Sequence, residues 1–94
     1  MAANFRISTR KDADGIHLRL QGDFDGSSAY ELLNVLKSRC RGISRVFIHT
    51  GRLRSVHPFG LGVFGSNLDF LKNRAVRVVY CGRHAAEISP GVRP

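Results

Sequence analysis

The chain has 94 residues, of which 43% are hydrophobic and 23% are charged; this length provides one domain with one core, and these fractions are ordinary for a globular protein. Lys and Arg number 15 against 7 Asp and Glu, a formal net charge of +8 that favours an anionic partner such as nucleic acid, phosphate or an acidic protein surface. No apolar run reaches the about 18 residues of a membrane-spanning helix and no signal-peptide core is present, so we expect a cytoplasmic protein that does not enter a membrane.

The N-terminal part of the chain has the pattern of a β-hairpin. Apolar and polar residues alternate over 5–10 and again over 16–21, as in strands with one buried and one wet face. Turn-forming residues at 11–15 separate the two segments. Residues 22–26, rich in Gly and Asp, are expected to end the second strand.

A predicted helix follows over residues 28–41. Ser28 with Glu31 three residues later forms a capping-box pattern, which is typical of a helix N-terminus. Apolar residues then recur at helical spacing as far as Cys40, and Gly42 is a stop signal. Cys40 and Cys81 both fall on predicted buried positions, so we expect free, buried thiols rather than a disulfide.

Residues 45–73 form the central segment of the chain. An apolar, β-prone run predicts a buried strand over 45–49, and 51–56 is expected to be a basic loop. Pro58 suits the first position of a second helix, predicted over 59–72. Its residues Leu61, Phe64, Leu68 and Leu71 are spaced to share one buried face.

Gly60, Gly62 and Gly65 lie in the first two turns of this second helix. Each lowers helix propensity by up to about 1 kcal/mol relative to Ala, so close approach of another backbone is the expected reason for them. Together they spell the G-x-G-x-x-G fingerprint of dinucleotide-binding proteins. The predicted loop before the helix and the absence of an acidic residue after the next strand argue against nucleotide binding.

A last strand is predicted near 76–81, a helical fragment at 84–88 and an irregular tail at 89–94. The fold class is therefore α/β, with element order β-β-α-β-α-β in a single domain of residues 1–94 whose core covers about 5–88. Strands separated by single helices imply a mixed sheet with packed helices.

At this point the residues resemble a known family, the STAS domains, whose founding members are bacterial anti-sigma-factor antagonists. Leu20-Gln21-Gly22-Asp23-Phe24-Asp25 is similar to the family's L-x-G-x-L/F-D at the end of its second strand, and Gly60-Leu61-Gly62-Val63 is similar to its G-L-G segment. The resemblance covers roughly residues 5–88, with the family's last helix cut short. It implies a mixed sheet with packed helices and a protein-binding module without catalysis of its own.

The resemblance also implies where a phosphoswitch would lie. In phosphoswitch members a serine in D-S-S/T-G-L-G, near the start of the second helix, is phosphorylated by a partner kinase that is itself the anti-sigma factor. His57, Pro58 and Phe59 occupy the Asp, Ser and second hydroxyl positions here. The phosphosite position, Pro58, has no hydroxyl, so modification at the usual place is impossible; a phosphosite moved to Thr50, Ser55 or Ser66 stays open.

Catalytic and metal sites are not expected. No histidines form an i, i+4 pair, the cysteines lack C-x-x-C spacing, and no residue sits in a nucleophile motif. We therefore expect no enzyme activity, no metal and no cofactor.

The leading hypothesis is a protein-interaction surface at the loop and helix start. Its expected partner-binding residues are Arg52, Arg54, Ser55, His57, Pro58, Phe59 and Val63, and its expected partner is an anti-sigma factor or a related kinase-like regulator with an acidic face. The alternative is a small basic domain that binds nucleic acid or another anion. For this alternative we expect a basic surface near the start of the second helix, formed by Arg41, Arg45, Arg52, Arg54, Lys72 and Arg74.

Overall fold

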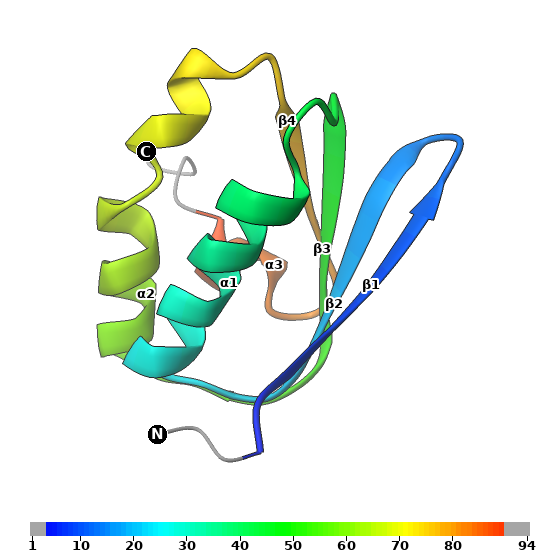
Figure 1. Cartoon of the computed structure of the whole chain (residues 1–94). Coiled ribbons are helices and arrows are strands. Elements are labelled where there is room, and N and C mark those ends of the chain that lie inside the picture. Colours follow the sequence, from blue (N-terminus) through cyan, green and yellow to red (C-terminus); the bar gives the residue numbers. More distant parts are fainter. Residues whose placement is uncertain (1–3, 90–94) are drawn as a thin grey trace.

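The computed structural model describes residues 4–89 and consists of one sheet and one layer of helices (Figure 1). The elements in chain order are β1 (Arg6–Asp12), β2 (Gly15–Phe24), α1 (Gly26–Arg39), β3 (Arg45–Val56), α2 (Pro58–Ser66), the 3-10 helix η1 (Asp69–Asn73), β4 (Arg77–Cys81) and α3 (Ala85–Ile88). The predicted α/β class and element order are confirmed. The predicted tail lies mostly outside the described residues.

The four strands form a mixed sheet in the order β1-β2-β3-β4. β1 and β2 pair antiparallel as the predicted hairpin, whereas β2 with β3 and β3 with β4 pair parallel through the helical crossovers. Figure 1 shows α1 and α2 side by side against one face of the sheet, while its other face carries no helix. We call this uncovered side the open face.

The core lies between the sheet and the helices. Side chains at alternate strand positions, among them Leu18, Leu20 and Ile48, have no exposed surface, and Leu32 and Leu36 of α1 cover them. The rings of Phe24 and Phe64 meet edge to face with centroids 6.1 Å apart. Because Phe64 belongs to α2, this contact fixes the second helix to the end of β2.

The structure corrects the prediction that residues 51–56 form a loop. They belong to β3, which continues to Val56 beside an equally extended β2 that ends at Phe24 rather than at Gln21. Register shifts on either side of Gly22, which has φ +98°, let β2 continue where a break was expected. β3 takes one extra residue at each shift, between His49 and Arg52 and between Leu53 and Ser55, so the bulges lie in β3. Gly22 adopts its positive φ without steric cost, so it does not end the strand.

The first helix begins earlier than predicted, because its cap is Asp25 and not Ser28. The Asp25 Oδ1 atom accepts a hydrogen bond of 3.0 Å from the Ser28 backbone N–H, which is the N-cap interaction. Ser28 is instead buried and donates its hydroxyl to the Asp23 carbonyl oxygen at 2.6 Å. The junction between β2 and α1 is thereby tied at several points.

The second helix is shorter than the predicted 59–72. α2 ends at Ser66, where the Asn67 side chain donates to the Val63 carbonyl oxygen at 2.8 Å and competes with the next helical turn. The chain continues as η1, so the helical spacing of the predicted core face is lost after this point. Phe64 is fully buried, whereas Leu61 and Leu68 pack against the core only in part.

Cys40 and Cys81 are both free thiols, as predicted, although only Cys40 is fully buried. Burial raises the pKa of the Cys40 thiol above its ordinary value, which keeps it protonated and unreactive. No helix among residues 4–89 is long and apolar enough to cross a membrane.

Candidate functional site

The start of α2 is held in a fixed geometry. His57 has an extended backbone, with φ −92° and ψ 138°, and Pro58 occupies the first turn of the helix. This is the conformation that a following proline favours, and the ring fixes φ at a helical value. The His57 N–H donates to the Phe24 carbonyl oxygen at 2.9 Å, so the junction from β3 to α2 is bonded to the end of β2.

Gly60 explains how closely α2 approaches the rest of the chain. A Cβ atom at this position would lie 2.7 Å from the Asp25 carbonyl oxygen and 2.9 Å from that of Phe24. The predicted close backbone approach is therefore confirmed for Gly60. It is wrong for Gly62, where a Cβ atom would meet nothing within 4 Å. The space beside Gly60 is filled by protein backbone, which leaves no room there for a phosphate.

A groove of about 400 Å³ runs between α1 and α2 and is lined by Tyr30, Pro58, Phe59, Gly62, Val63, Ser66 and Asn67. We call it the α1–α2 groove. Phe59 is 74% exposed and Tyr30 is 56% exposed, and they are the exposed large hydrophobic side chains of the described residues. Val63 is 9% exposed and forms the floor. Exposed aromatic side chains beside an apolar floor are typical of the centre of a protein interface.

Asp23 organises the polar end of this region, next to the helix start. Arg54 donates to both carboxylate oxygens, at 3.1 and 2.7 Å, and the Ser55 hydroxyl donates at 2.7 Å. Hydrogen bonds from Arg54, Ser55 and Asn4 hold the pKa of the Asp23 carboxyl well below its usual range. The Ser55 oxygen also lies 3.4 Å from His57 Nε2, so three of the predicted site residues meet at one place.

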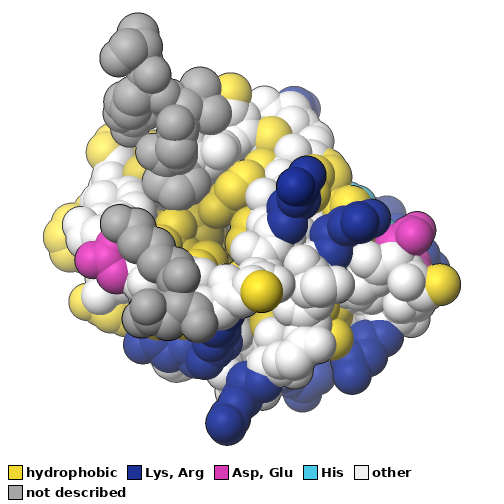
Figure 2. Space-filling model, turned by 90° about the horizontal axis from the view of Figure 1, so that it is seen from above, with side chains coloured by type: hydrophobic (Ala, Val, Ile, Leu, Met, Phe, Trp, Pro, Cys, Tyr) yellow, Lys and Arg dark blue, Asp and Glu magenta, His cyan; other side chains and the backbone are white. Residues whose placement is uncertain are grey.

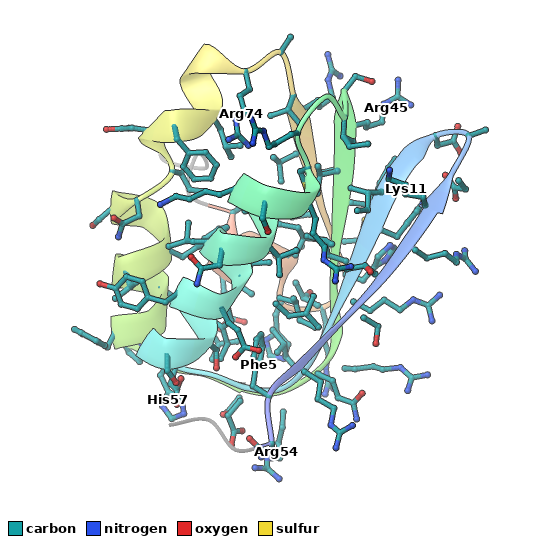
Figure 3. The ribbon with its side chains drawn as sticks, viewed as in Figure 1. Phe5, Lys11, Arg45, Arg54, His57 and Arg74 are labelled. Atoms are coloured by element: carbon teal, nitrogen blue, oxygen red, sulfur yellow. The ribbon has the colours of Figure 1, made fainter. Side chains whose placement is uncertain are left out.

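The predicted basic surface near the start of α2 is wrong, because its members are spread over the molecule. Figure 3 places Arg54 and His57 at one end and Arg45 and Arg74 at the other. Arg74 donates to the Leu36 carbonyl oxygen at 3.1 Å, beside the C-terminal end of α1. Figure 2 views the molecule from above and shows Lys and Arg side chains spread around it, with far fewer Asp and Glu side chains.

Arg52 also lies away from the α1–α2 groove. It pairs with Gln21 across β2 and β3, and both residues project from the open face. The extended β3 explains this separation, since residues of a strand alternate between the two faces while those of a loop need not. The structure therefore divides the predicted site into a helix-start group and a residue of the open face.

Two hydroxyl groups considered as relocated phosphosites are engaged in the fold. Thr50 has no exposed surface; it donates to the Cys81 carbonyl oxygen at 2.8 Å and accepts from the His84 N–H at 3.1 Å. Ser55 is half-buried and bonded to Asp23. Ser66 is exposed and lies in the α1–α2 groove.

Sequence reasoning missed Tyr30 and Asp23. Tyr30 lies outside the apolar stripe of α1, and an aromatic residue on the polar side of a predicted helix was the available signal. Asp23 was interpreted as a turn residue, because the length of β2 could not be read from its Gly and Asp content. Neither residue could be joined to Phe59 or Arg54 without the three-dimensional arrangement.

Comparison of the sequence with protein-family models and with curated proteins finds no match. Solved structures do match. The STAS-domain antisigma-factor antagonist from Rhodobacter sphaeroides superposes with a TM-score of 0.69 at 18% identity, covering 94% of this chain and 98% of that one. The anti-sigma factor antagonist SpoIIAA in its unphosphorylated form matches with a TM-score of 0.61 at 15% identity, covering 90% of this chain and 80% of that chain.

A further match is the protein Mglu, with a TM-score of 0.70 at 22% identity over 81% of this chain. This chain spans only 19% of the Mglu chain, about a fifth of its length. The two antagonist structures, in contrast, are matched over most of their length. The sheet order, the helical layer and these superpositions agree, and the chain has the STAS-like fold of the anti-sigma-factor antagonists.

Proposed function

We propose that this chain is a non-enzymatic protein-interaction module of the anti-sigma-factor-antagonist type and that it binds its partner through the α1–α2 groove. The observation that carries the proposal is the pair of exposed aromatic side chains, Tyr30 and Phe59, on either side of one apolar groove at the start of α2. The STAS-like fold supports the same assignment, since solved structures with this fold include anti-sigma-factor antagonists.

The partner that fits this surface has an apolar side chain for the groove and an acidic group at its rim. Phe59 stands beside His57, and Arg54 lies at the end of the sheet with 69% of its side chain exposed. Asp23 already neutralises part of the Arg54 charge, so the apolar contacts contribute the larger share of the binding free energy. An anti-sigma factor or a related kinase-like regulator is the proposed partner class.

The module is proposed to stay in one binding state. A phosphoswitch adds about −1.5 to −2 charge at a contact surface, and Pro58 has no hydroxyl to accept it. The helix start is also already ordered, because the His57 backbone is bonded to Phe24. Such preorganisation lowers the ordering cost of association.

The first experiment measures partner affinity after Phe59→Ala. A partner is captured from the native cells, purified and titrated against the wild-type chain and the variant by calorimetry. We expect Phe59→Ala to weaken binding by about 1–3 kcal/mol, because a truncated central aromatic side chain removes contacts in the groove. Phe59→Tyr keeps the ring and serves as the matched control, which should bind nearly as well as wild type.

The thermal midpoint should change little in either variant, since Phe59 is exposed. If Phe59→Ala bound the partner as tightly as wild type, the α1–α2 groove would not be the binding site. Unfolding of the variant would instead show that Phe59 supports the core.

A second experiment tests the fixed binding state. The chain is incubated with its partner and ATP, and phosphate is located by mass spectrometry. We expect no stoichiometric modification, because Pro58 lacks a hydroxyl and Thr50 is buried. Stoichiometric phosphorylation of Ser66 or Ser55 that changes partner affinity would show that the switch has moved.

A further inference from the structure

The open face of the sheet is crowded with arginine. Alternation along the strands and the pairing registers bring these residues to one side, together with His17, Phe47 and His49. Figure 3 shows side chains standing off the sheet on the side away from α1 and α2. We call the following set the arginine face: Arg6, Arg10, Arg19, Arg45, Arg52 and Arg77.

The arginines of the arginine face form no ion pairs within residues 4–89, since no carboxylate there lies within ion-pairing distance of any of them. The acids on the same side have other contacts, since Asp12 lies 3.0 Å from His17 and Asp23 binds Arg54. A backbone hydrogen bond, and more weakly the Arg10 charge, lower the pKa of Asp12, so Asp12 lies close enough to Arg10 for the two charges to interact. The six guanidinium groups still outnumber the two acids, so the face has a net positive potential.

Stacked rings occupy the middle of this charged face. His17 lies parallel to Phe47, with centroids 4.6 Å apart and planes at 9°. His17 also lies edge to edge with His49, with its Nδ1 atom 2.9 Å from His49 Nε2 and the ring planes at 17°. The rings stand on the two central strands, which carry Arg19 and Arg52 beside them. Arg10 is the register partner of His17 and Arg19 that of His49, so arginines flank the two histidines.

We propose that the arginine face binds a single-stranded nucleic acid, with phosphates on the arginines and bases stacked against Phe47 and the guanidinium planes. Arginine supplies forked donors that match phosphate and a plane that stacks, whereas lysine supplies only a point charge. Lys11, the one lysine in the four strands, pairs with the buried Ile16 and so belongs to the side of the helices. Four-stranded sheets with aromatic side chains use this arrangement to stack unpaired bases in other proteins.

The chemistry of the face favours nucleic acid over two other polyanions. A protein interface usually has an exposed apolar or aromatic anchor at its centre, but the exposed large hydrophobic side chains of the described residues, Tyr30 and Phe59, lie at the α1–α2 groove. A membrane surface would likewise require apolar side chains that insert between lipids. On the open face Phe47 is half-buried, so a base can stack on its ring, but it does not project into a partner or a bilayer as the exposed Phe59 could.

The proposal is tested by fluorescence anisotropy with a labelled oligouridine of about 12 nucleotides, a length within the usual range for single-strand sites. The variant Arg10→Gln/Arg19→Gln is compared with Lys37→Gln/Arg41→Gln, which removes the same charge from the helical side. At about 0.1 M salt we expect the first variant to lose about tenfold or more in affinity and the control to lose less than about threefold.

The salt dependence of binding is a second measurement, because it reports the number of phosphates contacted rather than the net charge of the chain. Each lost phosphate contact lowers the slope of log K against log salt by about 0.7 for a single strand, so Arg10→Gln/Arg19→Gln should lower it by about 1.4. The control should keep the wild-type slope. Phe47→Leu, which keeps an apolar side chain but removes the ring, should weaken binding by about fivefold or more.

Equal losses in the two double variants would overturn the proposal, because binding would then follow net charge alone. Equal or tighter binding of a duplex of matched length, of polyglutamate or of vesicles with anionic lipid would also overturn it. Circular dichroism and melting confirm that each variant is folded. Phe59→Ala should leave oligonucleotide affinity unchanged, so failure of this proposal and failure of the groove proposal are distinguishable.

Discussion

The two sides of this molecule differ in how their surfaces are made. The helical side offers a groove that exists only because α1 and α2 pack together, and two exposed aromatic side chains, Tyr30 and Phe59, line it. The open side offers charge laid out by simple strand alternation, and its exposed groups are mainly arginine. Much of the net charge of +8 therefore lies away from the groove, and the charge of the whole chain is a poor guide to the partner of the helical side.

The largest expected effect is on the free energy of unfolding, which should depend more on a core ring under the helices than on a ring of the open face. Phe64→Ala removes a fully buried ring that holds α2 to Phe24 and contacts Tyr80, and we expect it to lower the free energy of unfolding by about 3–5 kcal/mol. Phe47→Ala, on the open face, removes a half-buried ring and should cost less than about half as much. Urea denaturation measures both.

The same pair also tests whether the two surfaces are independent. Where Phe64→Ala remains folded, it should loosen the α1–α2 groove while oligonucleotide binding persists. If Phe64→Ala lost oligonucleotide binding as well as partner binding, the helical layer would also determine the shape of the open face.

A smaller effect distinguishes two glycines of α2. Gly60→Ala places a methyl group 2.7 Å from the Asp25 carbonyl oxygen, so it should destabilise the fold by about 1–3 kcal/mol through overpacking. Gly62→Ala enters open space and should be neutral or stabilising by up to about 1 kcal/mol, since alanine has the higher helix propensity. Equal effects of the two substitutions would show that α2 does not approach the β2–α1 junction as described.

Much of the fold could be predicted because local pattern and tertiary packing agree. Alternation at residues 16–21 and the apolar run at 46–48 match buried strand faces, and Pro58 marks the helix start. The predicted ends of β2 and α2 were wrong, because contacts made in the folded chain outweighed the local sequence signal. β2 continued through Gly22 because β3 pairs beside it and takes up the extra residues in its own bulges. α2 ended early because the Asn67 side chain competes for a helical carbonyl.

The candidate site was predicted only in part, because a groove joins residues from different elements. Phe59 could be recognised from its position beside the helix start, but its neighbour Tyr30 comes from α1. The wet face of the N-terminal hairpin already showed Arg6, Arg10 and Arg19. That Arg52 would join them depends on the parallel register of β2 and β3, which strand patterns do not contain.

The smallest predicted effect uses pH to test the crowding of charge on the open face. Burial, and then the charges of His17, Arg19 and Arg10, lower the pKa of His49 below its ordinary value of 6.5. The unfolded chain therefore binds the proton more readily, and stability rises with pH in the window below about 6.5. This contribution is fully present above the unfolded pKa and is lost as the pH falls through the folded one.

We therefore expect the thermal midpoint of wild type to fall between about pH 7.5 and pH 5.5, and that of His49→Gln to fall less, because glutamine does not take up the proton. Arg10→Gln should give an intermediate dependence, since it removes one of the like charges that lower the His49 pKa. Melts followed by circular dichroism at constant salt measure the effect. An identical pH dependence in all three chains would show that His49 does not carry it, and that the arginines of the open face lie too far from the ring, or are too well screened by solvent, to act on it.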